Sequence, residues 1–227
     1  MNPLNTQSNS QSNPKSVTQL PSKIVCVGRN YAEHARELGN EVPETPVLFL
    51  KPPSSVTGLE QGITWNKELG ECHFECELSI RIGQHLKNAT KEQAQAAIAG
   101  VTLGLDLTLR DLQNQLKTKG QPWERAKAFD GACVLGQWLA PDMLCDLSKT
   151  TFELSVNDEV RQQGNTADML FGVVDLLVDI SQVFTLEAGD VVMTGTPAGV
   201  AALTSGDQLK MTLHTVLGGV TWQTFVV

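Results

Sequence analysis

The sequence predicts an α+β fold that is predominantly β, and two observations lead to this expectation. Short apolar or alternating runs of strand length recur along the chain and dominate its last third. The few segments with helical character are expected on the outside of the domain. With 227 residues, of which 41% are hydrophobic, the chain is long enough for one large domain with a substantial core.

Strands are expected where such a run lies between turn residues. The runs cover residues 23–28, 46–55, 63–67, 74–83, 101–109, 151–158, 159–165, 190–195, 207–218 and 220–227. We expect the third and fourth runs to form a strand pair. Asn157 and Asp158 should form the turn of a hairpin, since both residues tolerate turn conformations.

Helices are expected at residues 30–39, 90–100, 110–120 and 169–184. The second of these has the clearest signals: Thr90 can cap its N-terminus, Gln93 follows three residues later, and Gly100 can end it.

Residues 1–20 are rich in Asn, Gln, Ser, Thr and Pro, and we expect them to form a polar arm before a domain at 21–227. The arm lacks the charged and apolar regions of a secretory signal, and no apolar run is long enough to span a membrane. Five cysteines, an odd number, do not indicate a disulfide framework. We therefore expect a cytoplasmic protein with reduced thiols.

The formal net charge of −8 and the pI of about 5.0 bear on the partner. An acidic chain without a basic stripe is atypical of proteins that bind nucleic acid or a membrane surface. A small ligand or a metal ion is the expected partner.

The segment at residues 71–83, ECHFECELSIRIG, combines cysteines, a histidine and carboxylates. In a strand, side chains alternate between faces, which places Cys72 and Cys76 with apolar residues and Glu75 and Glu77 on the polar face with His73. This separation argues against zinc bound by Cys and His together. Two alternatives remain for the glutamates: a solvated face, or a Mg²⁺, Mn²⁺ or Ca²⁺ ion bound by oxygen ligands.

Asp106 is a candidate for the third ligand. It lies in an apolar run with Arg110 predicted on the same face, and a charged group in such a strand requires a partner or a metal. The pattern leaves two possibilities, namely a metal ligand with a cation beside it for an anionic substrate, or an ion pair between Asp106 and Arg110.

Other residues could perform chemistry. His34 and Glu37, three residues apart on a predicted helix, could form a pair that activates water, although such pairs are common on helices. Lys127 lies between two alanines and could be a buried ammonium or an ordinary surface lysine. Residues 193–200, MTGTPAGV, could present N–H groups and hydroxyls to an anion, or could form a simple turn.

Together these segments resemble the fumarylacetoacetate hydrolase family, over about residues 21–227. The resemblance is carried, in the family's order, by GRNYAEHARE, PVLFLKPPSS, FECELSIRIG, GLDLTLRD, GQPWERAKAFD, RQQGNTADM and GDVVMTGTPAGV. It is greatest for the small single-domain branch, which includes acylpyruvate hydrolases, oxaloacetate decarboxylases and enol–keto oxaloacetate tautomerases. One departure is Phe74, a position that is often His in close relatives, while the nearby cysteines are not part of the family's site.

The resemblance implies a mixed β-sandwich roll, usually a homodimer, that binds Mg²⁺ or Mn²⁺. The positions that match the family's functional residues are as follows: metal ligands Glu75, Glu77 and Asp106; catalytic residues His34, Glu37 and Lys127; substrate-binding residues Arg110, Gln113 and Thr196.

The resemblance further implies an enzyme that acts on a 2-oxo acid and cleaves a C–C bond through a metal-bound enolate. The main expectation is an acylpyruvate or fumarylpyruvate hydrolase. The alternatives are an oxaloacetate decarboxylase or an enol–keto oxaloacetate tautomerase, because all three reactions use this enolate. A non-catalytic small-molecule binding protein is the alternative from another class.

Overall fold

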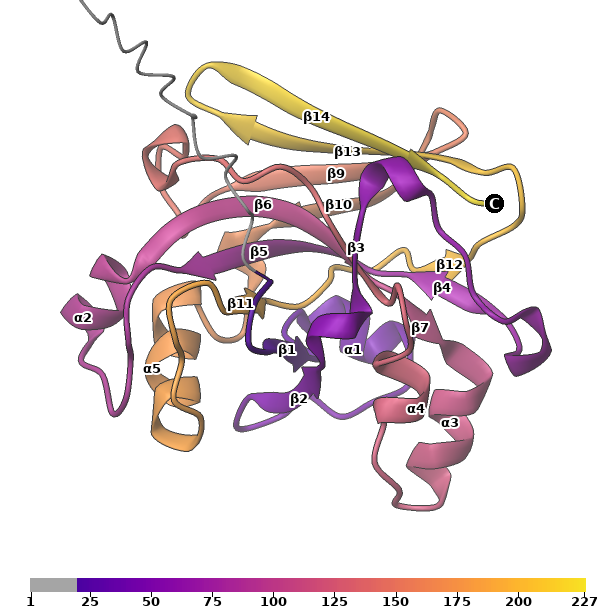
Figure 1. Cartoon of the computed structure of the whole chain (residues 1–227), viewed down its shortest axis with the longest axis horizontal. Helices are drawn as coiled ribbons and strands as arrows, with labels where there is room; N and C mark the ends of the chain where they lie inside the picture. Colours follow the sequence, from indigo (N-terminus) through magenta and orange to yellow (C-terminus); the bar gives the residue numbers. More distant parts are fainter. Residues whose placement is uncertain (1–19) are drawn as a thin grey trace, which may run out of the picture.

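The computed structural model describes residues 20–227, so the predicted polar arm lies outside the described residues except for Leu20. The centre of the fold is a mixed seven-stranded sheet (Figure 1). In spatial order its strands are β2 (Val47–Lys51), β1 (Ile24–Gly28), β11 (Val191–Met193), β5 (Cys76–Ile82), β6 (Ile98–Asp106), β8 (Cys133–Leu135) and β3 (Val56–Gly58).

A second, antiparallel sheet packs beside the first, and Figure 1 shows its strands as a layer over β5 and β6. This four-stranded sheet has the order β10 (Glu159–Asn165), β9 (Thr151–Val156), β13 (Gln208–Thr215) and β14 (Gly218–Phe225). A small third sheet consists of β12 (Ala201–Ala202), β4 (Cys72–Phe74) and β7 (Thr108–Leu109). The mostly β architecture confirms the predicted fold class.

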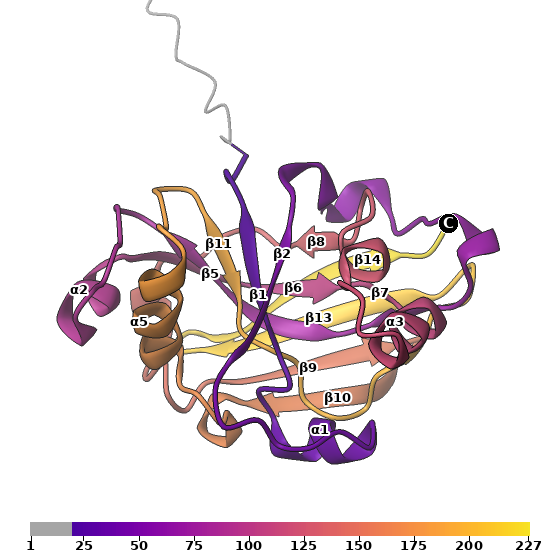
Figure 2. The same ribbon diagram turned by 90° about the horizontal axis from the view of Figure 1, so that it is seen from below.

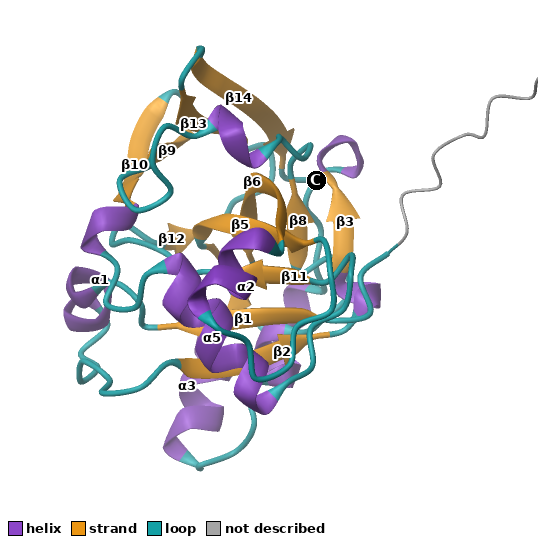
Figure 3. Cartoon of the chain, turned by 90° about the vertical axis from the view of Figure 1, so that its left-hand side faces the viewer, coloured by secondary structure: helices purple, strands orange, loops and turns teal. Residues whose placement is uncertain are grey.

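The helices lie around the outside of the strands, as Figure 2 and Figure 3 show. They are α1 (Ala32–Glu37), α2 (Lys91–Ala96), α3 (Arg110–Thr118), α4 (Glu124–Lys127) and α5 (Val173–Val183). Short 3₁₀ turns occur at η1 (Pro53–Ser55), η2 (Leu59–Gln61), η3 (Lys67–Leu69), η4 (Pro141–Met143) and η5 (Thr166–Asp168).

The hairpin prediction is confirmed, and two local predictions are wrong. Asn157 and Asp158 both have positive φ and join β9 to β10. The run at 63–67 forms no strand, because Asn66 caps η3 and only Ile63 makes a bridge, to Val226. The helix predicted at 90–100 has its capping box but ends at Ala96, since the following residues pair with β5 as strand β6.

The core lies between the two larger sheets, and the apolar side chains of β5 and β6 fill much of it. Cys72 and Cys76 are fully buried free thiols within this core, as predicted from their alternation with the glutamates. Within residues 20–227 no helix is long and apolar enough to cross a membrane. The packing of β5 against β6 also places the ends of both strands together, which positions the carboxylates described next.

Candidate metal and substrate site

Three carboxylates meet where β5 and β6 come together. Glu75 lies in the short break between β4 and β5, Glu77 is in β5, and Asp106 is the last residue of β6. One oxygen from each lies within 4.8 Å of the others, and all three residues are buried. The backbone N–H of Asp106 donates to the carbonyl of Glu75 at 2.8 Å, which fixes the two ligand-bearing segments side by side.

The predicted alternation is right about the glutamates but wrong about a single continuous strand. His73, which was expected on the same face, lies 3.5 Å from the exposed Glu71 and is not a member of the cluster. Of the described residues, only Glu75, Glu77 and Asp106 form a group of potential metal ligands. Their burial excludes the solvated-face alternative, and the group that these three carboxylates form includes no cysteine.

Three buried cations neutralise these carboxylates. The Nζ atom of Lys127, at the end of α4, lies 2.7 Å from an oxygen of Glu75 and 2.7 Å from one of Asp106. Arg110 forms an ion pair with Glu75, and Lys51 Nζ lies 2.8 Å from Asp106 Oδ1. The six charges sum to zero, so a divalent cation would leave the centre with a charge that an anionic substrate can balance.

The charges act differently on the two glutamates. Burial raises the pKa of Glu75, but the charges of Lys127 and Arg110 outweigh it and hold this pKa well below its usual value. Burial and the negative charges of Asp106 and Glu75 raise the pKa of Glu77 well above its usual value. Burial lowers the pKa of Lys127, but Asp106 and Glu75 raise it overall. Glu77 is thus the carboxylate with the least compensated negative charge.

The donor set fits a hard divalent cation. Asp106 Oδ1 is buried, and no donor approaches it in hydrogen-bonding geometry even though Lys51 is near. Three carboxylates converging within 4.8 Å match the all-oxygen ligation that Mg²⁺ and Mn²⁺ prefer. The structure therefore contains an acidic centre suited to such an ion.

The peptide bonds around Glu77 are held by the loop after β11 and by β10. Thr196 Oγ1 donates to the carbonyl of Cys76 at 2.9 Å, while Gln162 accepts from the N–H of Cys76 at 2.9 Å and donates to Thr196 Oγ1 at 2.8 Å. Gly195 N–H donates to a Glu77 oxygen at 2.8 Å, and its φ of +99° suits glycine. These bonds fix the direction of the Glu77 side chain.

His34 and Glu37 form the predicted pair on α1. His34 Nδ1 lies 3.2 Å from Glu37 Oε2, and Glu37 also accepts from the N–H of Gly199 at 3.1 Å. Gly199 has a φ of +99°, and a Cβ there would overlap the carbonyl oxygen of Arg161. His34 Nε2 forms no hydrogen bond among the described residues, so this nitrogen is available for proton transfer.

Arg110 and Gln113 lie in the site, but a helix positions Arg110 there and not the strand from which its position was predicted. Arg110 begins α3 and does not continue the strand, so it reaches Glu75 and not Asp106. Its guanidinium also donates to Gln113 Oε1 at 2.8 Å. The alternative of an ion pair between Asp106 and Arg110 is therefore wrong, because the chain turns into a helix between them.

Seven of the nine predicted residues line one narrow pocket, namely His34, Glu75, Glu77, Arg110, Gln113, Lys127 and Thr196. The other two, Glu37 and Asp106, do not line it but contact His34 and Lys127, which do. Its volume of about 30 Å³ holds one water molecule, so entry of a substrate requires its long side chains to move. A larger hollow of about 880 Å³ beside β3 and β14 contains none of the charged centre, and another of about 920 Å³ is lined by Lys51 but by no other charged residue of the centre.

Sequence reasoning missed four residues. Lys51 is the last residue of the otherwise apolar strand β2, where a single lysine before two prolines gave the only signal. Gln162 is directed inward by a register shift between Val160 and Gln162, which no sequence pattern indicated. Arg29 and Lys117 also line the pocket.

Comparison with known proteins is consistent with this site. The model of the fumarylacetoacetate hydrolase C-terminal domain matches residues 23–223. Oxaloacetate tautomerase YcgM of Escherichia coli is 52% identical over 84% of this chain and 88% of its own length. The mitochondrial oxaloacetate decarboxylase of Dictyostelium discoideum is 42% identical over 83% of this chain and 87% of its own.

A solved structure adds a metal ion to the comparison. The fumarylpyruvate hydrolase of Pseudomonas aeruginosa, in complex with Mn²⁺ and pyruvate, has a TM-score of 0.81 and 32% identity, and the match covers 90% of each chain.

Proposed function

This chain belongs to the fumarylacetoacetate hydrolase family of enzymes, and from that premise we propose that it interconverts the enol and keto forms of oxaloacetate with the help of Mg²⁺ or Mn²⁺. The observation that carries the proposal is the position of His34, a proton-transfer group, in the same pocket as the acidic centre. Enol–keto conversion needs only these two features: a group that moves a proton and positive charge that stabilises an enolate oxygen.

The similarities favour oxaloacetate over an acylpyruvate. The oxaloacetate tautomerase is 52% identical and the decarboxylase 42%, whereas the fumarylpyruvate hydrolase is 32% identical. The hydrolase expected from the sequence thus has weaker support than its alternatives. Decarboxylation is the second candidate, because loss of carbon dioxide from oxaloacetate produces an enolate that the same charges would stabilise.

Three residues would hold the ion, namely Glu75, Glu77 and Asp106. When bound, the ion supplies a Lewis acid that favours the negative oxygen of an enolate. The remaining steps depend on side chains that the structure shows.

His34 would transfer the proton at C3. Because Glu37 engages Nδ1, the Nε2 atom is the nitrogen that can remove a proton from C3 of the keto form and return it in the reverse direction. In the removal step the electron pair of the C–H bond becomes the C2–C3 double bond, and the carbonyl electrons move to oxygen. That oxygen then takes a proton from water, and the protonated His34 gives the proton from C3 to the hydroxide so formed, which restores the water and the neutral His34. Lys127 and Arg110 supply positive charge to the substrate oxygens.

The test measures three reactions on the same preparation. Loss of enol absorbance follows tautomerisation, pyruvate release from oxaloacetate follows decarboxylation, and pyruvate release from acetylpyruvate follows hydrolysis. We expect tautomerisation to be the fastest, to require Mg²⁺ or Mn²⁺, and to stop in EDTA. Acetylpyruvate hydrolysis faster than tautomerisation, or tautomerisation no faster than in buffer, would overturn the proposal.

A variant tests the role of His34. His34→Gln should lower the tautomerisation rate about 100- to 10,000-fold, the usual cost of losing a general acid–base group. Metal binding, measured by calorimetry, should be unchanged because His34 is not among the converging carboxylates. Arg36→Gln, an exposed change on the same helix, is the control. Equal activity of His34→Gln and wild type would exclude His34 as the proton-transfer group.

A further inference from the structure

Two cations of the pocket have no anionic partner. Arg29 and Lys117 line it together with Arg110 and Lys127, but unlike those two they form no ion pair or side-chain hydrogen bond within residues 20–227. The three carboxylates of the centre are already balanced in number by Lys51, Arg110 and Lys127, which form their ion pairs with Glu75 and Asp106. Arg29 and Lys117 therefore give the pocket two positive charges that no described protein group neutralises.

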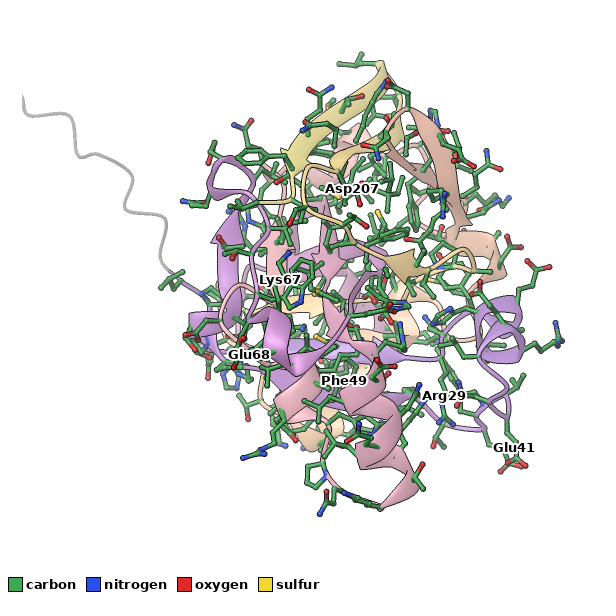
Figure 4. The ribbon with its side chains drawn as sticks, turned by 90° about the vertical axis from the view of Figure 1, so that its right-hand side faces the viewer. Arg29, Glu41, Phe49, Lys67, Glu68 and Asp207 are labelled. Carbon is green, nitrogen blue, oxygen red and sulfur yellow. The ribbon has the colours of Figure 1, made fainter. Side chains whose placement is uncertain are left out.

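Arg29 is held in an unusual backbone conformation. It directly follows β1 and has a φ of +58°, a region that residues other than glycine rarely adopt. Figure 4 shows its side chain in the space between α1 and α3, whereas the labelled Glu41 lies farther along the loop after α1 and is exposed. Strained backbone of this kind is concentrated at binding and catalytic sites, where it aims a side chain.

Lys117, on the last turn of α3, lines the same pocket as Arg29. Its side chain is partly buried, and burial together with the charges of Arg29 and Arg110 lowers its pKa. A surface lysine would normally extend into water and avoid such repulsion. Grouping three positive side chains costs free energy that an anion bound between them would offset.

We propose that Arg29 and Lys117 form a subsite for the distal carboxylate of the substrate, so that the enzyme selects small 2-oxo dicarboxylates over 2-oxo acids with a neutral distal group. This inference rests on the proposed function for its choice of oxaloacetate. The ion and Lys127 would take the 2-oxo acid end, and the two unpaired cations would take the other end. A divalent ion adds two positive charges to the neutral centre and Arg29 and Lys117 add two more, so a doubly negative substrate offsets more of this charge than a singly negative one.

The kinetic test compares oxaloacetate with its 4-methyl ester, which has the same reacting carbons and no distal charge. Arg29→Gln and Lys117→Gln should each raise the KM for oxaloacetate about 10- to 100-fold with a small change in kcat, as expected when a binding contact to a charged group is lost. For the ester, wild type and variants should have the same KM. Arg36→Gln and Lys119→Gln, which are exposed on α1 and just after α3, are the matched controls.

A binding measurement separates this inference from the proposed function. Calorimetry in Mg²⁺ would compare 3,3-difluorooxaloacetate, which cannot enolise, with oxalate, which offers the chelating end alone. The variants should bind difluorooxaloacetate about 10- to 100-fold more weakly than wild type and bind oxalate equally well. This pattern in a protein without tautomerase activity would reject the proposed function and keep the subsite.

Two outcomes would overturn the subsite. One is an equal loss of affinity for oxalate and difluorooxaloacetate, which would assign the two cations to the chelating end of the ligand. The other is no loss for either ligand. Two other variants keep the test valid if Arg29→Gln is poorly folded. Arg29→Lys keeps the charge at the strained position, and Lys117→Gln changes a residue on the surface of a helix. Arg29→Lys should recover at least part of the affinity for difluorooxaloacetate.

Discussion

Replacing Lys127 by methionine tests whether the Lys127 ammonium group provides the positive charge that a metal ion would otherwise provide to Glu75 and Asp106. The side chain bridges Glu75 and Asp106 with two 2.7 Å contacts and is buried. Methionine keeps much of the length but removes the charge, so the centre changes from three negative and three positive groups to a net charge of −1. Breaking a buried pair of this kind costs about 3–5 kcal/mol. For a chain of this size that corresponds to a fall in Tm of about 6–20 °C.

A metal ion should reverse this loss. In wild type an incoming Mg²⁺ competes with Lys127 for oxygens of Glu75 and Asp106, whereas in Lys127→Met those oxygens have no such competitor. An ion at 100 times its Kd stabilises a folded protein by about 2.7 kcal/mol. Because the variant should bind Mg²⁺ more tightly, its Tm should rise more than that of wild type at the same Mg²⁺ concentration.

Differential scanning calorimetry in EDTA and over a series of Mg²⁺ concentrations measures both effects. Lys119→Met, an exposed change just after α3, is the control and should behave as wild type in every condition. If Lys127→Met has the Tm of wild type in EDTA, the buried ion pairs do not stabilise the fold. If Mg²⁺ raises the two Tm values equally, Lys127 does not compete with the ion, and the reasoning fails.

Three further predictions concern protons and thiols. Burial and neighbouring carboxylates raise the pKa of Glu77, so its carboxyl group retains a proton to higher pH. The affinity for Mg²⁺ should therefore rise with pH, and binding of the ion should release a proton. Calorimetry in buffers of different ionisation enthalpy measures this release, and finding none at any pH would contradict the prediction. Burial acts to raise the pKa of Asp190, but hydrogen bonds from the side chain of Lys23, the backbone N–H of Glu187 and the side chain of Ser22 lower it overall. Asp190→Asn should therefore lower the free energy of unfolding by about 1–3 kcal/mol at pH 7, and this difference should fade as the pH falls below about 4. Urea titrations over a range of pH measure the difference, and a value independent of pH would argue against the prediction. Burial raises the pKa of Cys72 to about 12, and four of the five cysteines are buried, which leaves Cys145 exposed. A thiol reagent should therefore label one residue rapidly, and Cys145→Ser should remove that reaction. Rapid labelling of a second cysteine would refute the assignment.

The acidic centre could be predicted from the sequence because alternation in a strand is a local property. Glu75 and Glu77 are two residues apart, so their common face follows from the period of the strand alone. The isolation of Asp106 in an apolar run likewise indicated a need for compensation. The helical spacing of His34 and Glu37 predicted their contact, which the structure shows at 3.2 Å.

Where predictions from local patterns failed, the secondary structure was set by contacts with other parts of the chain. The run at 63–67 has strand composition but forms no strand, and the helix predicted to reach Gly100 stops at Ala96 because β6 pairs with β5. Arg110 was expected to follow Asp106 along one face, but the chain enters α3 at that residue. The pairing of β6 with β5 involves another segment of the chain, and no local signal within residues 90–100 reveals it.

The sequence by itself determined the mostly β class, the common direction of Glu75 and Glu77 and the helical His–Glu pair, because each depends on the spacing of neighbouring residues. The pairing of β5 with β6 brought Asp106 to the two glutamates. Only the tertiary structure decided which cations compensate the triad and which do not. Lys51 reaches Asp106 from the end of β2, and Arg29 and Lys117 line one pocket from different segments of the chain. Charge compensation depends on distances of a few ångströms between segments that folding brings together, and a linear sequence contains no direct measure of those distances.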